Sequence, residues 1–296
     1  MWPSRLARLW CRPGDRYVPP VTDIGVSDEY AHDFEWSVPS RLGTSAELRD
    51  GIMVGDVRSL PATLVHGALR VSAVVFFVDA VAGIAIDTDP EMWAFTSDLS
   101  VRLPVVPAPE RIVGRADVLR VGRRSATVAV PLQLPGGEDL GLGLVGFARV
   151  ARREGDPPKP DIDRMGLAEV WAGVAPLDVP LREAAGVRVL DAASGEVELA
   201  LKPDLLNPAG ALQGAMVALV AEAAAEELAT AAAGSPQVVT DIDVRYLAQS
   251  RQGPIRSRSR FIGPPSDGSI AVDLVDVTLD KLVTTVTLRT HPAPAV

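Results

Sequence analysis

The sequence has little of what several protein classes require. It contains a single cysteine, Cys11, so no internal disulfide can form, and this favours a reducing compartment such as the cytoplasm. Its three histidines, His32, His66 and His291, are too scattered for a metal site or a catalytic triad. No apolar run approaches the roughly 20 residues of a membrane-spanning helix, so we expect no integral membrane association. The net charge of −9 argues against a nucleic-acid partner, because phosphate binding requires a basic surface.

What the chain does contain is a repeat at an offset of 143 residues. Residues 67–80 align without a gap on residues 210–223. Identical residues continue downstream at the same offset, namely Asp98/Asp241, Val101/Val244, Arg102/Arg245, Ile112/Ile255 and Arg115/Arg258. A period this long indicates two copies of one domain rather than a solenoid. We expect an N-terminal extension over 1–45, a first repeat over 46–153, a Pro-rich linker over 154–185 with a short helix near residues 165–172, and a second repeat over 186–296.

Each repeat shows the same predicted order of elements, which is a strand, a long apolar helix and then four strands. The helices are expected over 70–87 and 213–233, and both are apolar nearly all round, so they must be enclosed. This predicts an α+β fold in which an antiparallel sheet wraps around each helix. The two sheets can pair edge to edge, which covers their exposed edges. The expected strands cover residues 51–57, 96–102, 111–119, 126–134 and 141–150, then 187–190, 195–201, 238–246, 255–262, 269–278 and 282–290.

An acidic residue stands near the middle of each apolar helix, Asp79 in the first repeat and Glu222 in the second. Burying an unpaired carboxylate costs several kcal/mol, so each needs either a function or a partner. Glu226 and Glu227 follow Glu222, and we therefore expect this end of the second helix to emerge into solvent.

The loop before the second helix carries a recognisable motif. Residues 207–215 read Asn-Pro-Ala-Gly-Ala-Leu-Gln-Gly-Ala, and Glu222 follows nine residues after Gln213. This resembles the hotdog-fold thioesterases, specifically the phenylacetate-pathway (PaaI-like) group, whose pattern is Asn, two residues, Gly, two residues, His-Gly-Gly, and an acid nine residues after the His. The resemblance covers about residues 186–291 well and 49–150 more weakly, and it implies a tandem double hotdog.

The sequence departs from that pattern in both repeats. Gln213 stands in place of the His and Ala215 in place of the second Gly. In the first repeat the three equivalent residues are Arg70, Val71 and Ser72, so the loop motif is lost while the acid is kept.

The resemblance also implies where an active site would lie, between the two units. The carboxylate of one helix would face the backbone amide at the start of the other helix. Asp79 would then face Asn207, Gln213 and Gly214, which we predict to be the working site. Glu222 would face the Arg70 loop, where Arg70 can neutralise it as a structural ion pair. Gln213 either hydrogen-bonds the substrate carbonyl or caps its loop, and the sequence leaves both open.

The activity that the resemblance implies is hydrolysis of an acyl-CoA, or of an acyl-carrier thioester, to free acid and thiol. No cofactor is expected beyond the coenzyme A of the substrate, and a homo-oligomer of double-hotdog units is compatible with it. Arg245, Arg256 and Arg258 are candidates to bind coenzyme A phosphates, the alternative being a solvated strand face. A non-catalytic acyl-CoA-binding or scaffold protein is the main competitor. A hotdog hydratase or dehydratase is disfavoured, because neither helix region contains the histidine that it needs.

Overall fold

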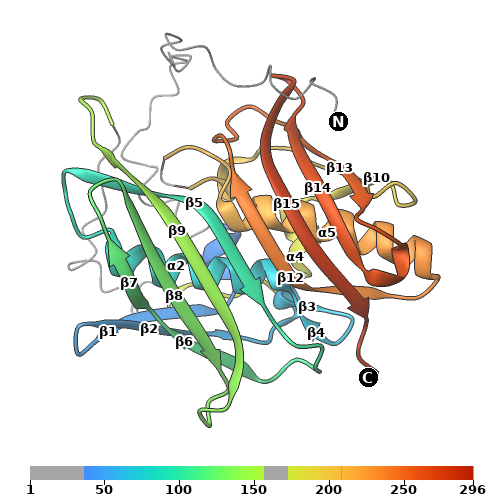
Figure 1. Ribbon diagram of the computed structural model, residues 1–296, viewed down its shortest axis with the longest axis horizontal. Helices are drawn as coiled ribbons and strands as arrows, with labels where there is room; N and C mark the ends of the chain where they lie inside the picture. The colour runs from blue at the N-terminus through green and yellow to red at the C-terminus, as the bar shows by residue number, and fades with distance from the viewer. Residues whose placement is uncertain (1–36, 157–172, 208, 296) are drawn as a thin grey trace, which may run out of the picture.

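The computed structural model describes residues 37–156, 173–207 and 209–295, and its main feature is one antiparallel sheet of 13 strands (Figure 1). The strand order is β1-β2-β6-β8-β9-β5-β12-β15-β14-β13-β11-β10, with β7 paired to β8. Two long helices, α2 and α5, lie behind this sheet in the view of Figure 1. The first half of the sequence supplies one side of the sheet and the second half the other.

The first half contains the helix α2 and the strands packed around it. Its elements are η3 (Pro39–Arg41), β1 (Thr44–Arg49), β2 (Ile52–Arg58), η4 (Pro61–Thr63), the small hairpin β3 (Leu64–Val65) and β4 (Ala68–Leu69), α2 (Val71–Ile86), β5 (Met92–Arg102), β6 (Arg111–Arg115), β7 (Asp117–Val121), β8 (Ser125–Gln133) and β9 (Asp139–Ala151).

The second half has a similar order around α5, without named counterparts of β3, β4 and β7. Its elements are α4 (Leu181–Ala185), β10 (Arg188–Asp191), β11 (Glu196–Leu199), η5 (Pro203–Leu205), α5 (Gly214–Ala233), β12 (Gln237–Tyr246), β13 (Ile255–Phe261), η6 (Pro265–Asp267), β14 (Ser269–Asp276) and β15 (Lys281–Pro292).

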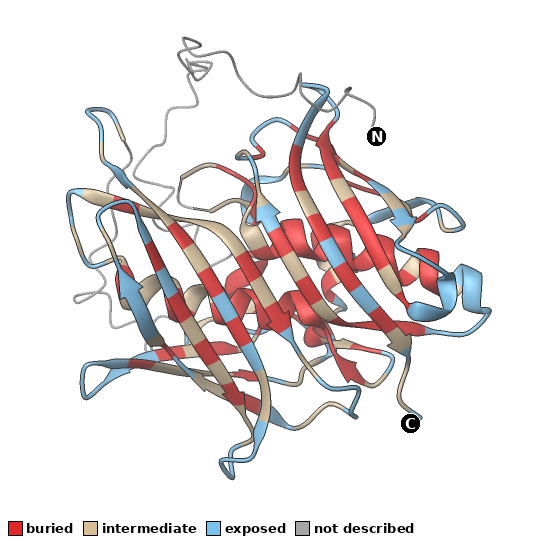
Figure 2. Cartoon of the chain, in the orientation of Figure 1, coloured by how far each residue is buried: buried red, intermediate tan, exposed pale blue. Residues whose placement is uncertain are grey.

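Both long helices are enclosed, as their apolar sequences require. Residues 71–78 of α2 and residues 215–226 of α5 are buried without interruption. Each helix packs against strands of its own half, and the two helices also contact each other. One continuous hydrophobic core therefore spans both halves, and Figure 2 shows buried residues along both helices and the strands in front of them.

The two halves are joined at the seam between β5 and β12, which run antiparallel. In this register Asp98 is opposite Arg245, and Arg102 is opposite Asp241. The second pair is the first one with the halves exchanged at the 143-residue offset, so the seam is self-complementary. Arg102 also makes ion pairs across it, at 3.4 Å from Asp241 and 2.6 Å from Asp243. The predicted edge-to-edge pairing of the two sheets is confirmed.

The predicted helices over 70–87 and 213–233 are present, but the prediction of one continuous strand over 111–119 is wrong. The expected strand 111–119 is divided at Ala116, whose N–H turns to the Met53 carbonyl at 2.8 Å, so that β7 pairs only with β8. The strand β1 begins inside the predicted extension 1–45. It forms a hairpin with β2 through Asp50 and Gly51, whose positive φ angles of 52° and 78° suit a two-residue turn.

The short helix α4 precedes the second repeat and had no counterpart among the predictions. The short helix that we expected near residues 165–172, most of the N-terminal extension and part of the Pro-rich linker lie outside the described residues.

Candidate active site

The loop before α5 is held by its own side chains. Asn207 Oδ1 accepts hydrogen bonds from the N–H groups of Ala209 (3.0 Å) and Ala211 (3.1 Å). Gln213 is the N-cap of α5, and its Oε1 accepts from the Ala215 N–H at 2.5 Å. Of the two roles left open for Gln213, the structure shows the capping one, which leaves only its amide NH2 group for other contacts.

Gln213 caps the Ala215 N–H and not the N–H of Gly214, the first residue of α5. Its N–H makes no hydrogen bond to any residue that the structure describes, and as the first amide of the helix it has no partner within the helix. The partial positive charge of the helix N-terminus adds to this donor. A donor of this kind stabilises a negative oxygen that develops next to it during a reaction.

A cavity of about 470 Å³ brings this helix start together with Asp79 of the other half. Asn207, Gln213, Gly214 and Asp79 all line it. The carboxylate of Asp79 is half-buried, and its Oδ1 accepts a hydrogen bond from Thr96 Oγ1 at 2.6 Å. Asp79 and the loop of the second repeat therefore line the same cavity.

The environment of Asp79 shifts its proton affinity. Burial raises the pKa of Asp79 from 3.8 to about 6, while the hydrogen bond from Thr96 acts in the opposite direction. A carboxylate with a pKa near 6 is still ionised at neutral pH, and it accepts a proton more readily than an ordinary aspartate does.

Several residues of this cavity were missed by the sequence reasoning. Tyr246 on β12 donates a hydrogen bond from its hydroxyl to the Gly214 carbonyl at 3.0 Å. Burial raises the pKa of Tyr246 well above its usual value, and the charge of Asp79 raises it further. Trp93 and Phe95 on β5 form part of the wall, with ring centroids 5.9 Å apart. For Thr96 the only signal was a hydroxyl at the start of a predicted strand, which many surface strands share.

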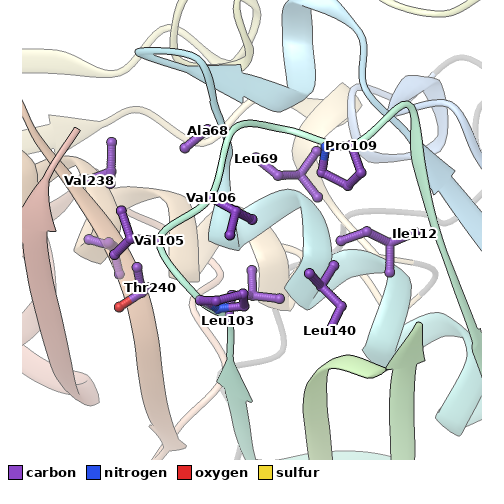
Figure 3. A pocket seen from close by; sticks show the side chains of 12 residues that line it. Ala68, Leu69, Leu103, Val105, Val106, Pro109, Ile112, Leu140, Val238 and Thr240 are labelled. Atoms are coloured by element: carbon purple, nitrogen blue, oxygen red, sulfur yellow. The ribbon is translucent and has the colours of Figure 1, made fainter. Parts of the chain in front are cut away.

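A second, much smaller cavity occupies the equivalent place near the start of α2. Its volume is about 20 Å³, and Figure 3 shows mainly apolar side chains converging in it. Leu103, Val106 and Val239 stand where the larger cavity has Tyr246, Gln249 and Thr96. At the 143-residue offset its lining residues 68–69, 103–106 and 238–240 correspond to residues 211–212, 246–249 and 95–97 of the larger cavity.

Glu222, the acidic residue of the second repeat, accepts hydrogen bonds with both of its carboxylate oxygens. Glu222 Oε1 accepts the Val71 N–H at 2.7 Å, and Val71 is the counterpart of Gly214. Its Oε2 accepts from Ser72 Oγ at 2.5 Å and from Arg70 Nη1 at 3.1 Å. Arg70 and Glu222 are both buried, so the predicted ion pair between them is confirmed. The Glu222 carboxylate thus binds the Val71 amide, whose counterpart in the other repeat, the Gly214 amide, is open.

The end of α5 emerges into solvent as predicted, but only at residues 231–233 and not at Glu226 and Glu227. Glu226 is only 3% exposed and lies 3.3 Å from Arg70 Nη1, with Arg182 at 3.9 Å. Glu227 pairs with Arg182 at 2.9 Å. Burial and the neighbouring Glu222 raise the pKa of Glu226 to about 7, although Arg70 and Arg182 oppose the shift. Two arginines from distant segments thus allow this acidic stretch to be enclosed.

The three arginines predicted for coenzyme A are not at the cavity of Asp79. Arg256 pairs with Glu198 at 2.6 Å and lies with Arg258 along a separate groove of about 440 Å³. Arg245 is exposed on β12, where its Nη1 donates to its neighbour's carbonyl, that of Val244. Arg251 lies nearer to the loop before α5. Its Nη1 is 3.7 Å from the position that a Cβ atom on Gly210 would take.

Two further properties concern the described part of the chain as a whole. No group of three or more His, Cys, Asp or Glu side chains there could hold a metal ion. The helices found there are too short or too polar to cross a membrane.

Comparison with known proteins places the fold. No model of a protein family matches this sequence, and no curated protein sequence matches it either. Among solved structures, a tesB protein of Mycobacterium avium subsp. paratuberculosis superposes with a TM-score of 0.60 at 14% identity, covering 87% of this chain and 98% of its own. The 12:0-ACP thioesterase of Umbellularia californica gives 0.55 at 13% identity, covering 83% and 99%. An acyl-ACP thioesterase of Bacteroides thetaiotaomicron gives 0.53 at 12% identity, covering 83% and 100%. The chain therefore shares its fold with these proteins.

Proposed function

We propose that this protein is a thioester hydrolase that cleaves an acyl-CoA or an acyl-carrier thioester. The observation that carries the proposal is the cavity in which the Asp79 carboxylate and the open Gly214 amide meet. An oxyanion donor and a carboxylate base on two sides of one cavity are the parts that thioester hydrolysis needs, because a thiolate is a good leaving group and needs little further help. The shared fold with proteins named as thioesterases supports the same function.

The proposed reaction begins with water held by Asp79. One carboxylate oxygen is engaged by Thr96, and the other is left to take a proton from the water. The water oxygen then bonds to the thioester carbon, and the carbonyl oxygen becomes an oxyanion on the Gly214 N–H. The carbon–sulfur bond breaks, the electron pair leaves with the thiolate, and protonated Asp79 returns the proton to it. The products are the free acid and the thiol.

We also propose that the chain is a tandem double hotdog with one working site. The 143-residue offset, the self-complementary seam and the paired positions of the two cavities support two copies of one domain, over 46–153 and 186–296. The site at Glu222 is closed. Arg70 and Ser72 donate hydrogen bonds to the Glu222 carboxylate, and the equivalent cavity measures only about 20 Å³. One acyl chain per polypeptide follows from this arrangement.

The test is thiol release from short, medium, long and aromatic acyl-CoAs by the wild type, Asp79→Asn and Glu222→Gln. Wild-type turnover should be lost in Asp79→Asn, by a factor of about 100 or more, and should persist in Glu222→Gln. Persistence in Asp79→Asn would overturn the assignment. If the wild type binds acyl-CoA without any turnover, the non-catalytic acyl-CoA-binding alternative is favoured. The absence of the loop histidine supports that alternative.

A further inference from the structure

Tyr246 touches the residue on which the proposed chemistry depends. Its hydroxyl donates to the Gly214 carbonyl at 3.0 Å. Its ring lies so close that a Cβ atom on Gly214 would be 3.0 Å from Oη and 3.3 Å from Cζ. The presence of Tyr246 therefore disfavours every residue larger than glycine at position 214.

The peptide group between Gly214 and Ala215 is held at both ends. Tyr246 binds its carbonyl oxygen, and Gln213 Oε1 binds its N–H at 2.5 Å. Glycine has an unusually wide choice of backbone angles, so the orientation of the Gly214 N–H would otherwise be poorly fixed. A peptide group held at both ends restricts those angles, and it does so without using the Gly214 N–H itself.

The first repeat, where the equivalent cavity is only about 20 Å³, serves as an internal comparison. There the counterpart of Tyr246 is Leu103 and the counterpart of Gly214 is Val71. The hydroxyl and the glycine are thus missing together in the half whose helix-start amide is taken by Glu222. Both are present in the half whose amide is open, where the hydroxyl bond adds to the helix hydrogen bonding instead of replacing it.

We propose that Tyr246 is a positioning residue that clamps the first turn of α5 and so keeps the Gly214 amide directed at the thioester oxygen. This rests on the proposed hydrolase function. The bland alternative is that the hydroxyl only satisfies its own hydrogen bond in a buried place. The two readings differ in what loss of the hydroxyl does to turnover.

The first experiment compares the wild type with Tyr246→Phe, which removes the hydroxyl and keeps the ring. With the amide less well directed, kcat should fall by about 10-fold, which is less than complete loss of an oxyanion donor would cost. KM should change less than about twofold, since ground-state binding is unaffected. Thr284→Val is the matched control, because Thr284 is buried opposite Tyr246 on β15 and does not line the cavity. A kcat of Tyr246→Phe equal to that of this control would overturn the clamp.

A second experiment uses Gly214→Ala in both backgrounds. Its added Cβ meets the Tyr246 hydroxyl, so alanine should reduce kcat less in the Tyr246→Phe background than in the wild type. Independent, multiplicative effects would overturn the shared action of the two residues.

A third readout needs no turnover and separates the clamp from the proposed function. The Ala215 amide hydrogen should exchange with solvent several-fold faster in Tyr246→Phe than in the wild type. An unchanged exchange rate would overturn the clamp even if the protein hydrolyses thioesters. Faster exchange in a protein that releases no thiol would retain the clamp and remove the hydrolase assignment.

Discussion

Asp79→Asn should make the protein more stable while abolishing its activity. The carboxylate of Asp79 is held in a cavity where burial raises its pKa from 3.8 to about 6. When folding raises the pKa of a carboxyl group, ionising that group costs more in the folded protein than in the unfolded chain. The free energy of unfolding therefore falls as the pH rises from about 4 through 6. Asparagine has nearly the same shape, stays neutral, and can still accept the hydrogen bond from Thr96.

The size of the effect follows from the two pKa values. At pH 8, above both of them, the ionised Asp79 costs ~3 kcal/mol of folding free energy relative to a neutral side chain. At pH 5 only part of this cost applies, ~1.5 kcal/mol, because much of the folded protein still holds the proton. For a chain of this length such a gain at pH 8 corresponds to a rise in melting temperature of roughly 5 °C.

The assay is thermal unfolding of the wild type and Asp79→Asn, followed by circular dichroism at pH 5 and pH 8. Asp139→Asn, at an exposed aspartate on β9, is the control for loss of one surface charge. The reasoning would be refuted by an Asp79→Asn protein that melts no higher than the wild type at pH 8. It would also be refuted by a gain that does not shrink between pH 8 and pH 5.

Three further predictions concern the same residues and their partners. The rate of thiol release should rise with pH through about 6 as Asp79 ionises, and in Thr96→Val this rise should move to higher pH, because the hydrogen bond that lowers the pKa is gone; an unmoved pH–rate profile would argue against Asp79 as the base. Arg70→Met should lower the free energy of unfolding, measured by urea titration at pH 8, by ~3–5 kcal/mol, since it leaves buried Glu222 without its cation; a loss under about 1 kcal/mol would contradict the buried pair. Folding raises the pKa of Glu226 from 4.5 to about 7, so wild-type stability should decline between those values as pH rises; the melting temperature of Glu226→Gln relative to the wild type should therefore increase from pH 5 to pH 8, and a constant difference would show that Glu226 does not titrate there.

Much of the architecture could be predicted from local pattern. The apolar stretches over 70–87 and 213–233 are long enough to indicate helices, and alternation marks most strands. The repeat then relates the two halves, and the resemblance of the loop motif implied that Asp79 and the Gly214 loop would face one another across more than a hundred residues.

The failures come where the outcome depends on a distant partner. The burial of Glu226 follows from Arg70 and Arg182, which reach it from segments far away in the sequence. Arg256 pairs with Glu198 on the neighbouring strand β11, a partner that its own strand does not reveal. Thr96 and Tyr246 carry no local signature, because a strand shows which face a side chain occupies but not which cavity it reaches.

The self-complementary seam between β5 and β12 has a consequence for mass action. A site formed between two separate identical subunits disappears on dilution, and every substitution in such a pair is made twice. Here both halves belong to one polypeptide, so the meeting of Asp79 with Gly214 is intramolecular and independent of protein concentration. The same covalent connection lets one half carry Tyr246 and Gly214 while the other carries Leu103 and Val71, a division of labour that no identical pair could adopt.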